Sequence, residues 1–174
     1  MKTAGNTILV TGGGSGIGLA LAQRWHDAGN RVIVTGRNAA KLDAAIAGRP
    51  NMSAMSLDVT DAEAIAAFAK EIVAKFPGLN VLVNNAGIMS AEDASAKRDL
   101  TQAEATVVTN ILGPIRLIDA LVDHLAAQAD SAIVNVTSGL AFVPFPRRRP
   151  IRRPRRRSTV TRSRCASGWR ARSR

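Results

Sequence analysis

The sequence contains no tyrosine and a single cysteine, Cys165. One cysteine excludes an intrachain disulfide and is typical of a protein of the reducing cytoplasm. No uninterrupted apolar run approaches the roughly 18 residues of a membrane-spanning helix, and the N-terminus lacks the layout of a signal peptide. The two histidines, His26 and His124, lie far apart on expected helices. We therefore expect a cytoplasmic protein with no membrane contact and no metal site.

Positive charge is concentrated in one stretch. The chain has 24 basic and 13 acidic residues among 174, and 13 of the basic residues are arginines between 147 and 174, where no acid occurs. The first 146 residues therefore carry 11 basic and 13 acidic residues, so the body is mildly acidic. We expect one domain over 1–146 and an Arg-rich, disordered tail over 147–174, which has too little apolar content to fold.

A glycine-rich stretch near the N-terminus is the most informative feature. The apolar residues 8–10 precede a glycine cluster, and a helical apolar pattern follows it, so we expect a strand, a turn and a helix. The spacing fits TGxxxGxG, with Thr11, Gly12, Gly16 and Gly18, and fits neither a P-loop nor GxGxxG. Such a turn favours a bound phosphate through free backbone N–H groups. The alternative is an ordinary glycine-rich turn without a ligand.

Strands and helices alternate along the body. Expected strands are 8–10, 31–35, 52–57, 79–83 and 131–137. Expected helices are 16–28 and 39–47, the second of which Asn38 caps. A further helix is expected to begin at the cap Thr60 and to end at 77–78. A weak helix is expected at 100–105 and an apolar one from about 107. This order predicts an α/β fold, a Rossmann-type doubly wound parallel sheet. We expect it to be truncated after the fifth strand.

Four signatures in register resemble the short-chain dehydrogenase/reductase family over residues 6–146. They are TGGGSGIG at 11–18, Asp58 after the third strand, NNAG at 84–87, and Asn110 followed by Ser138. The run NVTSGLAFVP at 135–144 further resembles DltE-like bacterial oxidoreductases. The resemblance implies an NAD(P)-dependent oxidoreductase that transfers hydride between the cofactor and a small-molecule carbonyl or alcohol substrate. It also implies that intact members form homo-oligomers.

The resemblance assigns cofactor-binding roles to three groups of residues. The first group would hold the pyrophosphate, the second would contact the adenine, and the third would lie against the adenosine ribose. These groups are Gly12, Ser15, Gly16, Ile17 and Gly18; Asp58 and Val59; and Asn85, Ala86 and Gly87. The asparagine pair would also tie neighbouring strands together. For Asp58, helix capping is the alternative role.

Cofactor choice follows from charge at the end of the second strand. An acid there would accept from the ribose 2′-hydroxyl of NAD and repel a 2′-phosphate. Gly36 and Arg37 stand there instead, and arginine is suited to phosphate binding. We therefore expect NADP, with NAD as a second possibility. The alternative is that Arg37 is only a solvated loop charge.

The family's catalytic set is Asn, Ser, Tyr and Lys, of which Asn110 and Ser138 are present. The positions expected for Tyr and Lys hold Ile151 and Arg155. A one-base shift of reading frame near residues 145–147 permits Tyr and Lys at these two positions, so our hypothesis is a spurious, out-of-frame tail. The chain as written then lacks the pair that moves the proton, and we expect little or no activity.

Two further readings remain open. The chain could be a nucleotide-binding module without chemistry, or a regulator whose basic tail is genuine and binds nucleic acid. We favour neither, so a nucleic-acid partner is not expected. With nothing beyond the fifth strand, we expect an exposed sheet edge and a partly uncovered apolar helix at 107–126. Poor solubility or association through that face would follow.

Overall fold

The computed structural model describes residues 2–89, 97 and 99–139. The expected Arg-rich tail at 147–174, with its positions Ile151 and Arg155, lies outside these residues. So does the end of the predicted domain, beyond residue 139. The fold described below is therefore that of residues 2–139 without the gap around residues 90–98.

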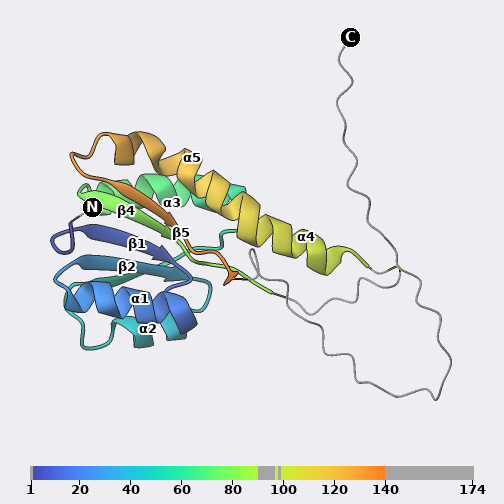
Figure 1. Ribbon diagram of the computed structural model, residues 1–174, viewed down its shortest axis with the longest axis horizontal. Helices are drawn as coiled ribbons and strands as arrows, with labels where there is room; N and C mark the ends of the chain where they lie inside the picture. The colour runs from blue at the N-terminus through green and yellow to red at the C-terminus, as the bar shows by residue number, and fades with distance from the viewer. Residues whose placement is uncertain (1, 90–96, 98, 140–174) are drawn as a thin grey trace, which may run out of the picture. The chain divides into compact units, whose positions relative to one another are not determined.

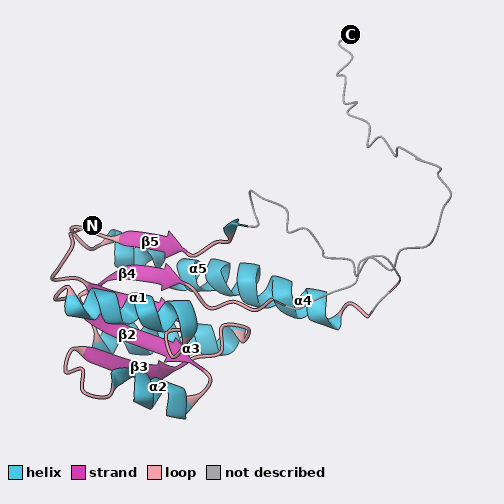
Figure 2. Ribbon diagram, turned by 60° about the horizontal axis from the view of Figure 1, so that its bottom comes forward, coloured by secondary structure: helices cyan, strands magenta, loops and turns pink. Residues whose placement is uncertain are grey.

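The described residues form one parallel sheet of five strands. The strands are β1 (Thr7–Thr11), β2 (Arg31–Gly36), β3 (Met52–Ser56), β4 (Leu79–Asn84) and β5 (Ala132–Asn135). Their spatial order is β3-β2-β1-β4-β5, and every neighbouring pair is parallel. Figure 2 shows the strands side by side with helices before and behind them. The chain leaves β1 in one direction for β2 and β3 and in the other for β4 and β5. This doubly wound order confirms the predicted Rossmann-type fold.

Helices cover both faces of the sheet, as Figure 1 shows. They are α1 (Gly16–Asp27), α2 (Ala39–Ile46), α3 (Ala62–Lys75), α4 (Thr101–Val107), the π-helical segment η1 (Val108–Leu112) and α5 (Gly113–Ala126). The first two pack on one face, and α3 and α5 pack on the other. Because both faces are covered, β1, β2 and β4 are almost continuously buried.

Alternate residues of the strands belong to two separate hydrophobic cores, one on each face of the sheet. Ile8, Val10, Val32 and Val34 point to the side of α1 and α2. The core on the side of α3 and α5 contains the intervening residues of β1 and β2, Leu82 of β4 and the buried stripe of each helix, namely Leu9, Ile33, Leu82, Ile65, Phe68, Ile72, Leu117, Leu121 and Leu125. The alternation follows from the two-residue period of a strand. The two cores fix the sheet between its helix layers.

One of the two predicted helix caps is correct. The Asn38 side chain accepts from the backbone N–H of Lys41 and caps α2. The prediction that Thr60 caps α3 is wrong, because Asp61 is the N-cap and accepts from the N–H groups of Glu63 and Ala64. The Thr60 hydroxyl instead donates to Asp58 at 2.8 Å. A carboxylate one residue nearer the helix therefore takes the capping role.

The helix expected from about residue 107 is longer than predicted. It runs without a break from Thr101 to Ala126 through η1, and joins the separate weak helix that we expected at 100–105. Its length and a mean hydropathy of 1.5 would suffice to cross a membrane, but core helices of soluble proteins meet the same criterion. Leu117, Leu121 and Leu125 are buried against the sheet. The part of the helix that packs in this way therefore serves as a layer of the fold.

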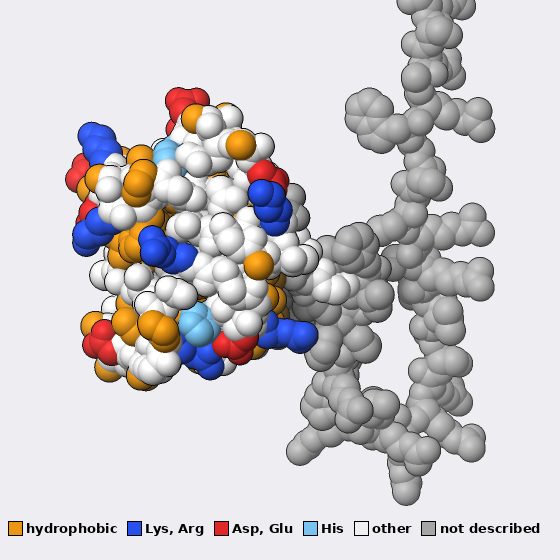
Figure 3. Space-filling view, turned by 90° about the vertical axis from the view of Figure 1, so that its left-hand side faces the viewer, with side chains coloured by type: hydrophobic (Ala, Val, Ile, Leu, Met, Phe, Trp, Pro, Cys, Tyr) orange, Lys and Arg blue, Asp and Glu red, His pale blue; other side chains and the backbone are white. Residues whose placement is uncertain are grey.

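An apolar strip stays uncovered among the described residues. On the long helix, Val107, Ile111, Ile115 and Val122 are 41–55% exposed. Strand β5 lies at one edge of the described sheet, and its Ile133 is 38% exposed. The end of the molecule at the amino ends of the strands carries charged side chains of both signs, interspersed with apolar ones, in Figure 3. The exposed residues of the long helix and β5 form the apolar strip.

The carboxyl ends of β1 and β4 are joined through one buried hydroxyl. Thr11, which is 2% exposed, accepts from the N–H groups of Asn85 and Ala86 at 3.0 Å and donates to the Val83 carbonyl at 3.3 Å. The Asn85 side chain donates back to the Thr11 carbonyl at 2.9 Å. This reciprocal bonding sets the path of the chain as it leaves β4.

Substitution Thr11→Val should destabilise the fold by about 2 kcal/mol, because two backbone N–H groups lose their acceptor while the side-chain volume stays nearly the same. Thr7→Val on the same strand is the matched control, since the Thr7 hydroxyl makes no hydrogen bond within the described part of the chain. Urea denaturation of both variants measures the difference. Equal midpoints would contradict the structural role of the Thr11 hydroxyl.

Candidate nucleotide-binding cleft

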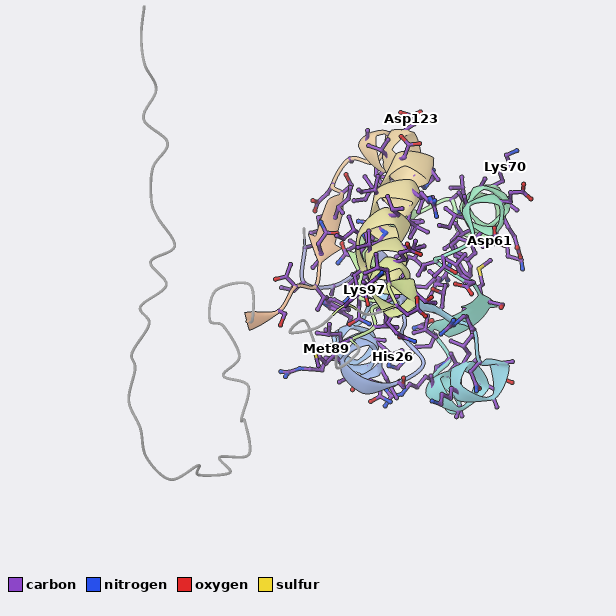
Figure 4. All side chains as sticks on the ribbon, turned by 90° about the vertical axis from the view of Figure 1, so that its right-hand side faces the viewer. His26, Asp61, Lys70, Met89, Lys97 and Asp123 are labelled. Carbon is purple, nitrogen blue, oxygen red and sulfur yellow. The ribbon has the colours of Figure 1, made fainter. Side chains whose placement is uncertain are left out.

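A cleft of about 750 Å³ opens at the carboxyl ends of the strands. Figure 4 faces this end of the sheet, with the long helix through the centre and α3, which begins after the labelled Asp61, beside it. The walls are the glycine turn after β1, the β2–α2 connection, the loop after β3, the segment after β4, and one side of α4 and η1. The lining residues are Gly12, Gly14, Ser15, Ile17, Thr35, Gly36, Arg37, Asn38, Lys41, Leu42, Leu57, Asp58, Val59, Thr60, Asn85, Ala86, Gly87, Ile88, Ala105, Val108 and Thr109.

The glycine turn approaches the segment after β4 closely at two of its positions, Gly12 and Gly18. A Cβ on Gly18 would collide with the side-chain nitrogen of Asn85 and would lie 2.5 Å from the Gly12 carbonyl oxygen. Gly12 has φ +65°, and a Cβ there would lie 3.0 Å from the Ala86 Cα. The turn is therefore pressed against the segment that follows β4. Because neither glycine has a side chain, the turn can approach both the Ala86 backbone and the Asn85 side chain.

The start of α1 presents backbone donors at the same place. Ser15 is the N-cap, its side chain makes no capping hydrogen bond, and no acidic residue lies in the first turn. The first N–H groups of a helix have no intrahelical acceptor, and the helix dipole adds positive potential there. Ile17, in this first turn, lines the cleft and is 68% exposed. This helix start is suited to an anion with an apolar neighbour.

Asp58 lies in the wall after β3 with its two carboxylate oxygens in different surroundings. One oxygen accepts from the Thr60 N–H at 2.9 Å and from the Thr60 hydroxyl, and the other lies 3.8 Å from Nη1 of Arg37. Partial burial acts to raise the pKa of Asp58, but the Thr60 hydrogen bonds and the Arg37 charge outweigh it and lower the pKa. Asp58 is therefore ionised at neutral pH, and one of its oxygens is bonded locally.

The long helix is tied to the loop after β4 through Asn110. The Asn110 side chain accepts from the Ile88 N–H and donates to the Ile88 carbonyl, both at 2.8 Å. Asn110 lies within η1, and a Cβ on Gly87 would lie 3.3 Å from its side-chain oxygen. A π-helical segment of this kind is a local irregularity that is frequent at functional sites. Asn110 thus acts on the cleft through the Ile88 backbone.

The same helix also braces the wall that contains Asp58 and Val59. Arg116 donates to the Thr60 carbonyl at 3.1 Å. A Cβ on Gly113 would lie 2.8 Å from the Val59 carbonyl oxygen, so the helix backbone approaches this loop closely. Two opposite walls of the cleft are therefore held by one helix.

The structure gathers most of the predicted site residues. Nine of them line the cleft: Gly12, Ser15, Ile17, Arg37, Asp58, Val59, Asn85, Ala86 and Gly87. Gly16 and Gly18 belong to the same turn without lining the cleft. Asn110 lies behind Ile88, and Ser138 is an exposed residue three positions beyond β5, outside the cleft lining. The expected ties are present too, since Asn84 donates to Asn135 of β5 at 2.9 Å and Asn85 bonds β1.

Sequence reasoning missed the contribution of α2 and of the long helix. Lys41 and Leu42 line the cleft from the first turns of α2, and Ala105, Val108 and Thr109 line it from α4 and η1. Lys41 follows Arg37 by four residues, and this pair of basic residues after β2 is the sequence signal that could have placed Lys41 at the cleft. Nothing in the apolar pattern of the long helix marks which of its faces meets the cleft.

The fold and this cleft define a Rossmann-type domain of the nucleotide-binding kind. Comparison with known families identifies it further, because the short chain dehydrogenase family model matches residues 6–150. The chain belongs to the short-chain dehydrogenase family.

Three relatives illustrate the likeness. An uncharacterized oxidoreductase, DltE, of Bacillus subtilis (strain 168) is 41% identical over 146 residues, covering 83% of this chain and 58% of that protein. Sulfoacetaldehyde reductase 2 of Chromohalobacter salexigens is 33% identical over 143 residues, covering 80% and 57%. The solved structure of ElxO with NADP bound has a TM-score of 0.74 at 32% identity and covers 81% of this chain and 58% of that one. The chain thus spans a little over half the length of these relatives.

The residues present fit a dinucleotide at this cleft. The backbone cradle at Gly12 and Gly18 excludes a Cβ, the start of α1 offers N–H donors, and the buried hydroxyl of Thr35, a residue of the cleft lining, makes no hydrogen bond among the described residues. A buried polar atom without a partner calls for a ligand or a water.

Substitution Gly18→Ala should weaken binding of a nicotinamide dinucleotide at least about tenfold, because its methyl group forces the turn away from Asn85. Gly78→Ala is the matched control, since a Cβ there meets nothing nearer than 3.8 Å and its φ is not positive. Isothermal titration with NADPH compares the two variants. Unchanged affinity in Gly18→Ala would show that the turn does not hold the ligand.

Proposed function

We propose that this chain carries the cofactor-binding half of an NADP-dependent oxidoreductase that acts on a small carbonyl or alcohol substrate. The observation that carries the proposal is the close approach of the glycine turn to Asn85, which lines the cleft. Support comes from the family match, from a relative named as an aldehyde reductase, and from a similar structure with NADP bound. A nicotinamide nucleotide supplies or accepts a hydride when it is bound.

Each cleft wall then has a role toward the cofactor. The turn residues Gly12, Ser15, Gly16, Ile17 and Gly18 hold the pyrophosphate through backbone N–H groups at the start of α1. The Asp58 oxygen that faces Arg37 accepts from the adenine amino group while Thr60 holds the other oxygen, and Val59 packs on the ring. Asn85, Ala86 and Gly87 bring backbone to the adenosine ribose, and Thr11 fixes their path.

Charge favours NADP over NAD. Arg37, 69% exposed in its side chain, lines the cleft at the end of β2, and no acid follows that strand directly. Its partner Asp58 is 3.8 Å away, so the pair is loose and the guanidinium is accessible to a phosphate. A 2′-phosphate would therefore find a donor with bidentate geometry.

Substitution Arg37→Ala should raise the Kd for NADPH about 10- to 100-fold and leave the Kd for NADH within about twofold, because only the phosphorylated ribose meets the guanidinium. Arg31→Ala, at the exposed opposite end of β2, serves as the control. Fluorescence titration with both nucleotides provides the data. Equal losses for NADPH and NADH would contradict the assigned NADP preference, and a chain that binds neither nucleotide would contradict the proposed function itself.

The 174-residue sequence contains only part of the catalytic set that the family resemblance implies. Ser138 would hold the substrate oxygen by a hydrogen bond, and Asn110 positions the segment around Ile88. No tyrosine occurs in the sequence to give or take the proton at that oxygen. The second candidate is therefore a nucleotide-binding module without chemistry, and the missing tyrosine is the observation that favours it.

The 174-residue chain, which has no tyrosine, should bind NADPH yet show no measurable turnover on a panel of aldehydes and ketones. A gene whose frame is shifted by one base near residues 145–147, to encode Tyr at 151 and Lys at 155, should gain turnover of at least about a hundredfold over background, since general acid catalysis contributes factors of this size. NADPH oxidation at 340 nm measures both proteins. Turnover by the printed chain would overturn its inactivity, and binding without turnover by the shifted one would favour the module.

A further inference from the structure

The cleft has a second cation near Arg37 for which the described residues provide no partner. Lys41 lines the cleft, and its ammonium group makes no hydrogen bond or ion pair with any described residue. Among the ionisable residues of the cleft lining, the others are Arg37 and Asp58, which face each other at 3.8 Å. The described cleft lining therefore has one positive charge in excess, and Lys41 supplies it.

Lys41 also stands at the less favourable end of a helix for a cation. It is the third residue of α2, where its own N–H donates to the cap residue Asn38 at 2.9 Å. The helix dipole places positive potential at this end, so acids are favoured there and cations are not. The first turn of α2 holds no acid that would compensate. A lysine here gains stabilisation when an anion binds beside it.

The backbone holds Lys41 at the cleft. A Cβ on Gly14 of the glycine turn would lie 3.6 Å from both the carbonyl carbon and the Cβ of Lys41, so the first turn of α2 packs on that turn. Leu42, the next residue, is 4% exposed and anchors the helix in the core. The position of the Lys41 backbone is therefore fixed, and only its flexible side chain has to adjust to a ligand.

A phosphate monoester carries up to two negative charges. Arg37 alone neutralises little of this charge, because the Asp58 carboxylate lies beside it. We propose that Lys41 is a specificity-determining residue of this site, whose ammonium group binds the 2′-phosphate of NADP together with the Arg37 guanidinium. This inference rests on the proposed function. The pair Arg37 and Lys41 offsets the dianion, while Thr60 keeps Asp58 bonded on the other side.

The test measures binding, by titration calorimetry on the full chain with NADPH and NADH and with the fragments adenosine 2′,5′-bisphosphate and 5′-AMP. Lys41→Met should raise the Kd for NADPH and for the bisphosphate about tenfold and leave NADH and 5′-AMP unchanged. Lys41→Arg should restore most of the affinity, because it restores the charge. Lys70→Met, on the exposed side of α3 (labelled in Figure 4), should behave like the unmodified chain.

The outcomes separate the two proposals. If the unmodified chain binds neither NADPH nor NADH, the proposed function fails and the Lys41 role fails with it. If NADPH binds but Lys41→Met changes neither the NADPH nor the NADH affinity, the Lys41 role alone is overturned. Equal weakening of NADPH and NADH would also overturn it, since that result places the ammonium group at the pyrophosphate.

Discussion

The contact between the glycine turn and Asn85 is the constraint on which the cleft depends. Gly18 has to lack a Cβ because the Asn85 side chain occupies that space, and Asn85 is held there by its hydrogen bonds to Thr11. The segments that follow β1 and β4 thus meet through the backbone of the glycine turn and the side-chain amide of Asn85. This close approach leaves N–H groups of the chain exposed to a ligand at the carboxyl edge of the sheet, which is where doubly wound folds bind their ligands.

A second organising element is the long helix from α4 to α5. Through Asn110 it holds the loop after β4, and through Arg116 it holds the loop after β3. These loops come from strands on opposite sides of β1 in the sheet. One helix therefore contacts two cleft walls, with Asn110 in its π-helical segment and the buried stripe of α5 on the sheet.

Much of this could be predicted from the sequence, because the signals are local. The five parallel strands of a doubly wound sheet, and the places of Gly18 and Asp58 beside them, follow from motifs in register on alternating strands and helices. The predicted cap of α3, Thr60, is wrong by one residue, because Thr60 and Asp61 are adjacent and both suit a cap. The continuity of the long helix and the place of Lys41 in the cleft depend on packing between distant segments, and no periodicity in the sequence encodes them.

Hydrogen–deuterium exchange of the full chain, with and without saturating NADPH, tests the central claim most directly. The account predicts slower exchange of backbone amides in the glycine turn, residues 12–18, and after β4, residues 85–88. The amino ends of the strands should show no change beyond general stabilisation. Exchange rates in those two segments that stay the same with and without NADPH would contradict the account.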